Sequence, residues 1–194
     1  MTKILIIQGH PTPGGGHFCH ALADAYAQGA ASGGHEVHRL TVTDLDFPVL
    51  RDRASWEKAA PPPDIARAQA EIKWANHLVF IYPLWLGALP ALLKAFLEQV
   101  ARPGFAFTVG SDGSGMQVLL KGRSARTIVT MGMPGLIYSW WFGALTLRSL
   151  EQNILAFVGI GPCRNTVIGL VEGMSNEKRN SWLDTLRRLG RNAQ

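Results

Sequence analysis

Hydrophobic residues in this chain gather in short apolar runs, separated by stretches in which apolar positions recur every three or four residues. Two runs, residues 3–8 and 77–82, are almost continuously apolar, which is typical of strands buried on both faces of a sheet. Weaker runs cover residues 36–42, 125–131 and 164–168. The pattern predicts five strands, with residues 77–82 at the centre of the sheet.

Helical spacing fills the gaps between these runs. Phe18, Leu22 and Tyr26 recur on one face of a first helix, which ends at Gly33-Gly34. Further helices are expected at residues 64–75, 91–100, 141–158 and 176–189, with Asp64 as an N-cap. Residues 44–63 are irregular, and residues 102–123, which carry five glycines, predict a loop or hairpin insertion.

The alternation of strands and helices predicts an α/β fold, a parallel sheet with helices on both faces. A length of 194 residues suits one domain, and no linker divides the chain. We therefore expect a single domain over residues 1–194.

Composition excludes several classes of protein. With 47% hydrophobic and 17% charged residues, the chain is too apolar for a disordered protein. We expect no membrane insertion, because no stretch of roughly 18 apolar residues is free of charges or breaks. The first apolar run is too short for a secretory signal. Cys19 and Cys163 lie far apart, so no disulfide framework is expected, and a cytoplasmic location follows.

The net charge of +5 is spread along the chain, with no basic-aromatic stripe. This pattern argues against a nucleic-acid partner. A mild positive field also suits small anionic ligands such as nucleotides and phosphates.

Candidate chemistry lies in three loops, residues 9–17, 83–90 and 132–138, which follow the first, third and fourth strands. Ligands of open α/β sheets bind beyond the carboxyl ends of the strands, so these loops are expected to converge on one crevice.

The first loop meets the start of a helix and carries four glycines, which favours phosphate binding with His10 as a donor. It is neither a Gly-x-Gly-x-x-Gly nor a Walker sequence. His17 and His20 could share a helix face as metal ligands. No carboxylate or cysteine stands beside them with useful spacing, so no metal site is expected.

The second loop is apolar and aromatic, and such a wall suits a flat heteroaromatic ring. Trp85 and Leu86 could instead merely cover the sheet edge. The third loop offers Thr130, Gly132 and the phenol of Tyr138, although a lone tyrosine more often packs than reacts.

Several motifs occur in an order that resembles the flavodoxin-like NAD(P)H:quinone oxidoreductases. That family includes bacterial "modulator of drug activity" proteins and the ancillary oxidoreductases of potassium-efflux systems. The motifs are Gly9-His10-Pro11, the helix 64–75, Tyr82-Pro-Leu-Trp85, Leu89-Pro-Ala-Leu-Leu-Lys94, Pro103-Gly-Phe-Ala-Phe107 and Leu120-Lys-Gly122.

The resemblance implies a doubly wound, five-stranded flavodoxin-like sheet of order 2-1-3-4-5, a homodimer and a bound flavin. It also implies ping-pong hydride transfer from NAD(P)H to a quinone that enters the same pocket. Between the two flavins, FAD is slightly favoured over FMN.

The resemblance also places site residues. The flavin phosphates would be surrounded by His10, His17, Phe18 and Cys19. The ring edge would contact Pro83, Leu84, Trp85, Leu86 and Gly87. The pyrimidine side would meet Thr130, Met131, Gly132 and Met133. Tyr138 would lie over the ring as the candidate catalytic residue.

The chain also departs from the family. His17 and Cys19 stand where many members carry Ser and Asn, and Leu86 and Gly87 replace bulkier aromatics of the animal enzymes. The histidine that partners the tyrosine in those enzymes has no counterpart, because Ala144 falls at that spacing. A Tyr–His proton relay is therefore not expected.

Two other functions are compatible with the same fold. A flavodoxin-like electron carrier is one, although such carriers are usually acidic and this chain is basic. The other is a regulatory subunit of a cation-efflux transporter, which would keep the fold for contact with its partner.

Overall fold

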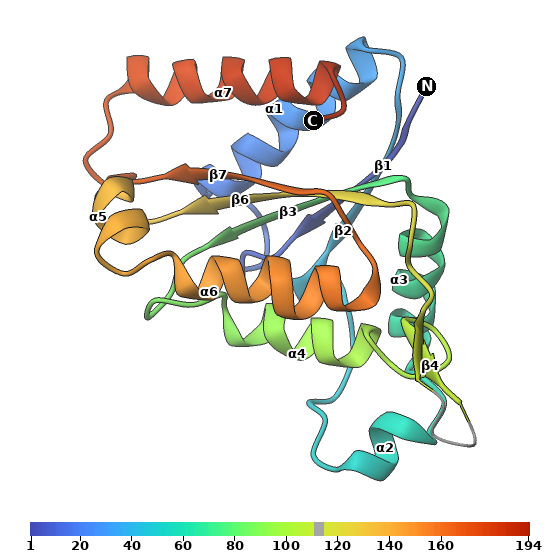
Figure 1. Ribbon diagram of the computed structural model, residues 1–194. Helices are drawn as coiled ribbons and strands as arrows, with labels where there is room; N and C mark the ends of the chain where they lie inside the picture. Colours follow the sequence, from blue (N-terminus) through green and yellow to red (C-terminus); the bar gives the residue numbers. More distant parts are fainter. Residues whose placement is uncertain (111–114) are drawn as a thin grey trace.

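The centre of the protein is a five-stranded parallel sheet (Figure 1). The structure, a computed structural model, describes residues 1–110 and 115–194. Its sheet strands are β1 (Lys3–Gln8), β2 (Glu36–Thr41), β3 (His77–Pro83), β6 (Ser124–Thr130) and β7 (Cys163–Ile168). They lie in the order β2-β1-β3-β6-β7 and every neighbouring pair is parallel. Since β4 and β5 form a separate hairpin, this is the predicted 2-1-3-4-5 order, and the flavodoxin-like α/β fold is confirmed.

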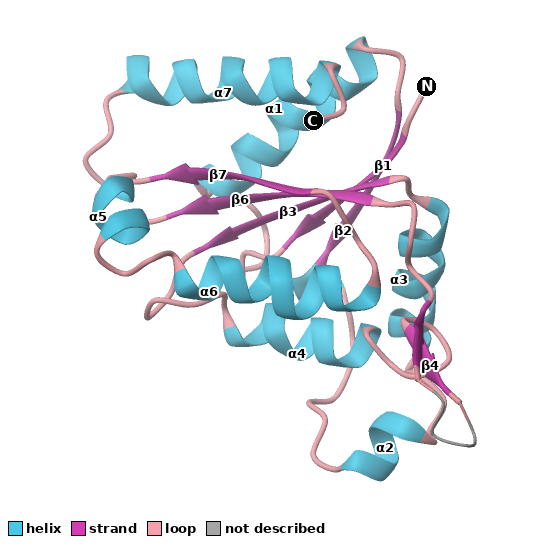
Figure 2. Ribbon diagram, in the orientation of Figure 1, coloured by secondary structure: helices cyan, strands magenta, loops and turns pink. Residues whose placement is uncertain are grey.

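Helices cover both faces of the sheet, as Figure 2 shows. The helices α1 (Phe18–Ser32) and α7 (Asn176–Arg191) lie on one side, and α3 (Pro63–Trp74) and α4 (Ala91–Val100) on the other. Alternate residues of β1 and β3 therefore enter two different cores. Ile4, Ile6, Val79 and Ile81 are buried toward α1 and α7, whereas Leu5, Ile7, Phe80 and Tyr82 are buried on the opposite face. Both faces being covered explains why these strands are apolar at nearly every position.

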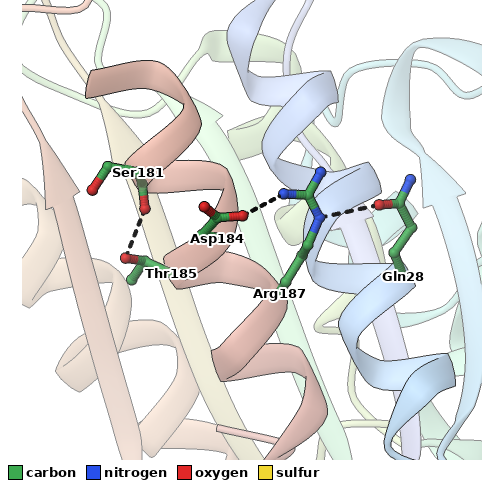
Figure 3. Close-up of polar contacts among 5 residues, drawn as sticks. All are labelled: Gln28, Ser181, Asp184, Thr185 and Arg187. Atoms are coloured by element: carbon green, nitrogen blue, oxygen red, sulfur yellow. Dashed lines mark hydrogen bonds and ion pairs between the residues drawn. The ribbon is translucent and has the colours of Figure 1, made fainter. Parts of the chain in front are cut away.

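The layer formed by α1 and α7 is held by close packing and polar contacts (Figure 3). Arg187 of α7 donates to Asp184 at 2.7 Å and reaches across to Gln28 of α1 at 3.3 Å. A side chain at Gly29 or Gly190 would collide with the backbone of the opposite helix. The C-terminal helix is thereby fixed to the sheet through α1.

Most segments outside the sheet follow the sequence pattern, with local differences. The hairpin expected within residues 102–123 is present as β4 (Phe107–Val109) and β5 (Met116–Val118), while residues 111–114 lie outside the described part. The irregular segment contains η1 (Val42–Asp44) and the short helix α2 (Arg53–Glu57).

Asp64 is not the N-cap that its position suggested, because α3 already begins at Pro63 and Asp64 lies in its first turn. Its carboxylate accepts a hydrogen bond from the Asp46 N–H at 2.7 Å instead. This contact attaches the irregular segment to the start of α3.

The single helix expected at residues 141–158 is wrong. The structure has α5 (Gly135–Trp140), α6 (Leu145–Arg148), a π-helical turn η2 (Ser149–Leu155) and a 3₁₀ turn η3 (Ala156–Val158). Gly143 and Ala144 have positive φ values of 60° and 47°, which a continuous helix cannot contain. The break turns the chain between α5 and α6 and brings their side chains together.

Candidate functional site

Three loops leave the carboxyl edge of the sheet side by side. The loops after β1, β3 and β6 start from adjacent strands, because β3 lies between β1 and β6. The Gly9 N–H donates to the Ile81 carbonyl at 2.8 Å, and the Leu84 N–H donates to the Thr130 carbonyl at 2.7 Å. These bonds fix the start of each loop relative to its neighbour.

Gln8 organises the first of these loops. Its side chain is buried, donates to the Cys19 carbonyl at 3.1 Å and accepts from the His10 N–H at 3.1 Å. One amide thereby joins the end of β1, the loop and the first turn of α1. Sequence reasoning did not select Gln8. The available signal was a polar residue that ends an otherwise apolar strand.

The three histidines at this loop lie together. The His10 and His17 rings stack with centroids 4.0 Å apart, and His20 lies 5.3 Å from His10 and 5.8 Å from His17. His10 is buried, and its Nδ1 accepts from the Thr12 N–H at 3.2 Å, so its single proton is on Nε2. Burial, helped by the neighbouring His17 and His20, lowers the pKa of His10 to about 4. His10 is therefore a neutral N–H donor near pH 7.

His20 adds a buried atom that lacks a partner. Its Nδ1 has no hydrogen-bond partner in the described part of the chain. Burial lowers the pKa of this imidazole too, with His17 contributing. Within residues 1–110 and 115–194 no group of His, Cys, Asp or Glu side chains is arranged to hold a metal ion.

Cys19 and Phe18 occupy the first turn of α1, where the expected phosphate would approach. No side chain caps this helix in the described structure, so its first N–H groups are open to a ligand. The Cys19 thiol is buried against the Thr130 hydroxyl at 3.1 Å, and burial raises its pKa to about 11. Phe18 lies beneath the Arg179 guanidinium at 5.0 Å. At this turn the backbone, more than either side chain, faces a ligand.

The second loop forms a tight two-residue turn. Trp85 and Ala88 exchange two backbone hydrogen bonds of 2.9 Å, and between them Leu86 and Gly87 have φ values of 46° and 76°. Two successive positive φ values are typical of a type I′ turn. Neither the Leu86 nor the Gly87 N–H has an acceptor in the part of the chain that is described. The turn therefore presents two free donors at the end of the central strand.

Apolar side chains surround these donors. Trp85 and Leu86 are exposed, Leu84 is half-buried and Pro83 is buried. The Trp85 ring lies edge-on to His10, with centroids 6.2 Å apart. The first two loops therefore meet, as the sequence predicted, and their contact joins the histidine cluster to the apolar turn.

The third loop is fixed by hydrogen bonds of its backbone. Met131 is buried and donates to the Ile168 carbonyl at 2.9 Å, and the Met133 carbonyl accepts from the Leu170 N–H at 3.2 Å. Gly132 between them is exposed. A Cβ added to Gly132 would lie 3.3 Å from Oε1 of Glu172. The sequence analysis did not identify Glu172 as a candidate site residue.

Tyr138 lies buried on α5 with its hydroxyl fully engaged. The hydroxyl lies 2.9 Å from the Thr146 hydroxyl and accepts from the Leu147 N–H at 3.2 Å. Thr146 in turn donates to the Gly87 carbonyl at 2.5 Å. The catalytic role of Tyr138 stays a prediction, but its partner here is Thr146, which lies two residues beyond the Ala144 position considered from the sequence.

A flavin fits this donor set. The glycine-rich loop and open helix start suit a phosphate, and the orphaned His20 Nδ1 lies in the same cluster. The free N–H groups of the Trp85–Ala88 turn suit the polar edge of a ring whose face contacts apolar side chains.

Comparisons with known proteins agree with this arrangement. Residues 2–189 match the Flavodoxin_2 family, described as having a flavodoxin-like fold. An FMN-dependent NADH:quinone oxidoreductase of Ruegeria pomeroyi is 30% identical over 148 residues, covering 69% of this chain and 72% of the relative. An FMN-dependent NADH:quinone oxidoreductase 3 of Bacillus cereus is 27% identical, covering 90% and 89%. The solved NAD(P)H:quinone oxidoreductase of Methanothermobacter marburgensis has a TM-score of 0.80 at 23% identity, covering 100% and 99%.

These relatives overturn one expectation. The slight preference for FAD is wrong, because the Ruegeria and Bacillus relatives are FMN-dependent. The resemblance itself is confirmed by the family match and by both relatives: the chain belongs to the flavodoxin-like fold family that includes NAD(P)H:quinone oxidoreductases.

Proposed function

We propose that this protein is an FMN-dependent enzyme that passes hydride from NAD(P)H to quinone-type acceptors. The observation that carries the proposal is the Trp85–Ala88 turn, with two free N–H groups at the end of the central strand and the histidine loop beside it. The relatives named for FMN-dependent quinone reduction support the same activity.

In this proposal the first loop holds the phosphate. His10 donates through Nε2–H, His17 and the orphaned His20 Nδ1 lie within the same cluster, and the N–H groups of Phe18 and Cys19 face the anion. His10 can bind in its neutral form, because burial keeps its pKa near 4.

The second and third loops hold the ring. The backbone of Pro83, Leu84, Trp85, Leu86 and Gly87 would hold the edge that carries the reactive nitrogen. Thr130, Met131, Gly132 and Met133 would hold the pyrimidine side, and Tyr138 would support the site from α5. Bound FMN supplies the hydride chemistry, while the chain supplies orientation and electrostatics.

The chain's own groups favour the reduced state of such a ligand. The free Leu86 and Gly87 N–H groups would stabilise negative charge that arrives with hydride. The apolar side chains of Trp85 and Leu84 would limit the access of water to that edge when the ring is bound. We propose a ping-pong sequence, in which NAD(P)H and then the acceptor use the same site, because the resemblance to the quinone oxidoreductases implies it.

We further propose that the chain works as one domain, within a cytoplasmic homodimer. Leu136, Trp140, Trp141 and Phe142, on α5 and directly after it, are exposed and form an apolar patch that a second subunit would cover. No helix in the described ranges is long and apolar enough to span a bilayer. Light scattering at micromolar concentration should give twice the chain mass of 21.1 kDa.

The function is tested by titrating the purified protein with FMN, FAD and riboflavin, followed by anaerobic addition of NADH or NADPH. We expect tightest binding of FMN, weaker binding of riboflavin, and bleaching by a nicotinamide nucleotide that a quinone reverses. Binding of FMN without bleaching would favour the electron carrier. Bleaching without quinone turnover, together with co-purification of a transporter, would favour the regulatory subunit.

A further inference from the structure

Thr146 joins two parts of the site that are far apart in sequence. It lies on α6, its hydroxyl donates to the Gly87 carbonyl at 2.5 Å, and the Tyr138 hydroxyl lies 2.9 Å from it. Neither the motifs nor the relatives' names point to this residue.

The direction of these hydrogen bonds follows from counting protons. A hydroxyl carries one proton, and a carbonyl oxygen can only accept, so the proton of Thr146 is used on Gly87. The Tyr138 hydroxyl must then donate to Thr146, while its own oxygen accepts from the Leu147 N–H at 3.2 Å. The chain of bonds runs from Leu147 through Tyr138 and Thr146 to Gly87. Successive hydrogen bonds of this kind polarise and strengthen one another.

The acceptor belongs to a strained turn. Leu86 has a φ of 46°, a left-handed conformation that is unfavourable for a non-glycine residue. Two backbone bonds between Trp85 and Ala88 close the turn. They do not attach it to the rest of the protein, whereas the Thr146 bond ties it to α6.

We propose that Thr146 is a positioning residue: it holds the Trp85–Ala88 turn so that the free Leu86 and Gly87 N–H groups stay aimed at the flavin edge. The proposal rests on the function proposed above. Tyr138 acts through Thr146, because its only proton is already committed to that hydroxyl. Donors held in advance stabilise arriving charge better than donors that must reorient.

This role predicts a change in the redox equilibrium of the bound cofactor. In Thr146→Val, which keeps the shape and loses the hydroxyl, we expect the equilibrium constant for reducing bound FMN to fall about tenfold. For a two-electron couple, that corresponds to a midpoint potential about 30 mV lower. Thr146→Ser retains the donor and should restore the potential. Tyr138→Phe removes one link and should give a smaller decrease.

A matched control loses the same hydroxyl elsewhere. Thr185 on α7 donates to the Ser181 carbonyl at 2.9 Å (Figure 3). Helix α7 lies on the opposite side of the sheet from α6, which carries Thr146 (Figure 1). Thr185→Val should leave the potential unchanged, even if both valine variants lose a similar amount of thermal stability.

The experiment is dye equilibration of FMN-loaded wild type and variants, with FMN affinity measured alongside. An unchanged potential in Thr146→Val with FMN bound would overturn the positioning role. If the Thr146→Val variant does not fold, the potentials of Thr146→Ala and Tyr138→Phe test the positioning role instead. Failure of the wild type to bind FMN would instead overturn the proposed function, so the two failures are distinguishable.

Discussion

The first loop and the Trp85–Ala88 turn lie at the same edge of the sheet but are built in opposite ways. The turn is closed by two backbone hydrogen bonds and tied from outside by Thr146. In the loop, residues 14–16 are glycines with φ values of 81–83°, and a Cβ on any of them would meet nothing within 4 Å. Among the described residues, the hydrogen bonds of the loop lie near its ends, at Gln8 and His10 on one side and at the start of α1 on the other.

This difference separates two tasks. In the proposed function, the ring side needs donors that are already in place to stabilise charge, and the hydrogen bonds of the turn hold them there. The phosphate side combines glycines at positive φ with a cluster of imidazoles, which would receive an anion.

The largest effect is expected when the turn itself is broken. Gly87→Val places a β-branched residue at a φ of 76°, so the turn must open and its donors must move. We expect FMN affinity to fall about a hundredfold, or about 2.7 kcal/mol. Gly34 is the matched control, because it has a φ of 74° and open surroundings but lies between α1 and β2. Gly34→Val should destabilise the fold without weakening FMN binding, and equal losses in both variants would remove the turn from the site.

A smaller loss is expected at the third loop. Gly132→Val adds bulk beside the Glu172 carboxylate and obstructs close approach of a ring to the backbone. FMN affinity should fall about tenfold, or about 1.4 kcal/mol, by fluorescence titration. Gly173→Val is the control, because a Cβ added at this glycine meets no atom within 4 Å. Its FMN affinity should stay close to that of the wild type. Normal affinity in Gly132→Val would show that this loop does not touch the ring.

Acid should reduce the stability contributed by the histidine-bearing first loop, whereas the Trp85–Ala88 turn has no such group. The folded pKa of His10 is about 4, below its ordinary value of 6.5, so between these values the unfolded chain binds more protons. The stability that His10 contributes is complete above pH 6.5 and is lost as the pH falls toward 4. In urea unfolding of the protein without FMN, His10→Gln should lose less stability than wild type between pH 7 and pH 5. An identical loss in both proteins would contradict the buried, neutral imidazole.

The smallest expected effect is an increase in the stability of the protein. Leu86 is fully exposed at a φ of 46°, and asparagine tolerates this conformation better than leucine. Leu86→Asn should therefore stabilise the protein by about 0.5–1 kcal/mol, raising Tm by roughly 1–4 °C. FMN affinity should change less than threefold, since the backbone donors remain. A lower Tm in calorimetry would mean that the leucine side chain makes contacts that the exposed turn does not show.

Much of the fold was predictable from local pattern. The apolar runs in β1 and β3 have no polar face, so only a sheet covered on both sides can bury them. Given parallel strands, the carboxyl ends must share one edge, and this placed the loops after β1, β3 and β6 together. Helix α4 also covers Ala91–Val100, the range that its sequence predicted.

Other features left no local signal. Leu86-Gly87 is not the Asn-Gly pair that usually marks a type I′ turn, so this turn could not be identified from its residues. The break at Gly143 and Ala144 was hidden by apolar positions that continue at helical spacing on both sides. FMN was distinguished from FAD only by comparison with relatives, because both flavins share the ring and the first phosphate.

The sequence by itself determined the layer architecture and the sheet edge at which the three candidate loops meet, since both follow from which residues must leave water. Only the tertiary structure decided how the site is held. Gln8 reaches Cys19, and Thr146 reaches Gly87, across separations of 11 and 59 residues. Such bonds depend on where whole elements pack, because a single hydroxyl or amide becomes a positioning group only when folding places an acceptor within about 3 Å of it.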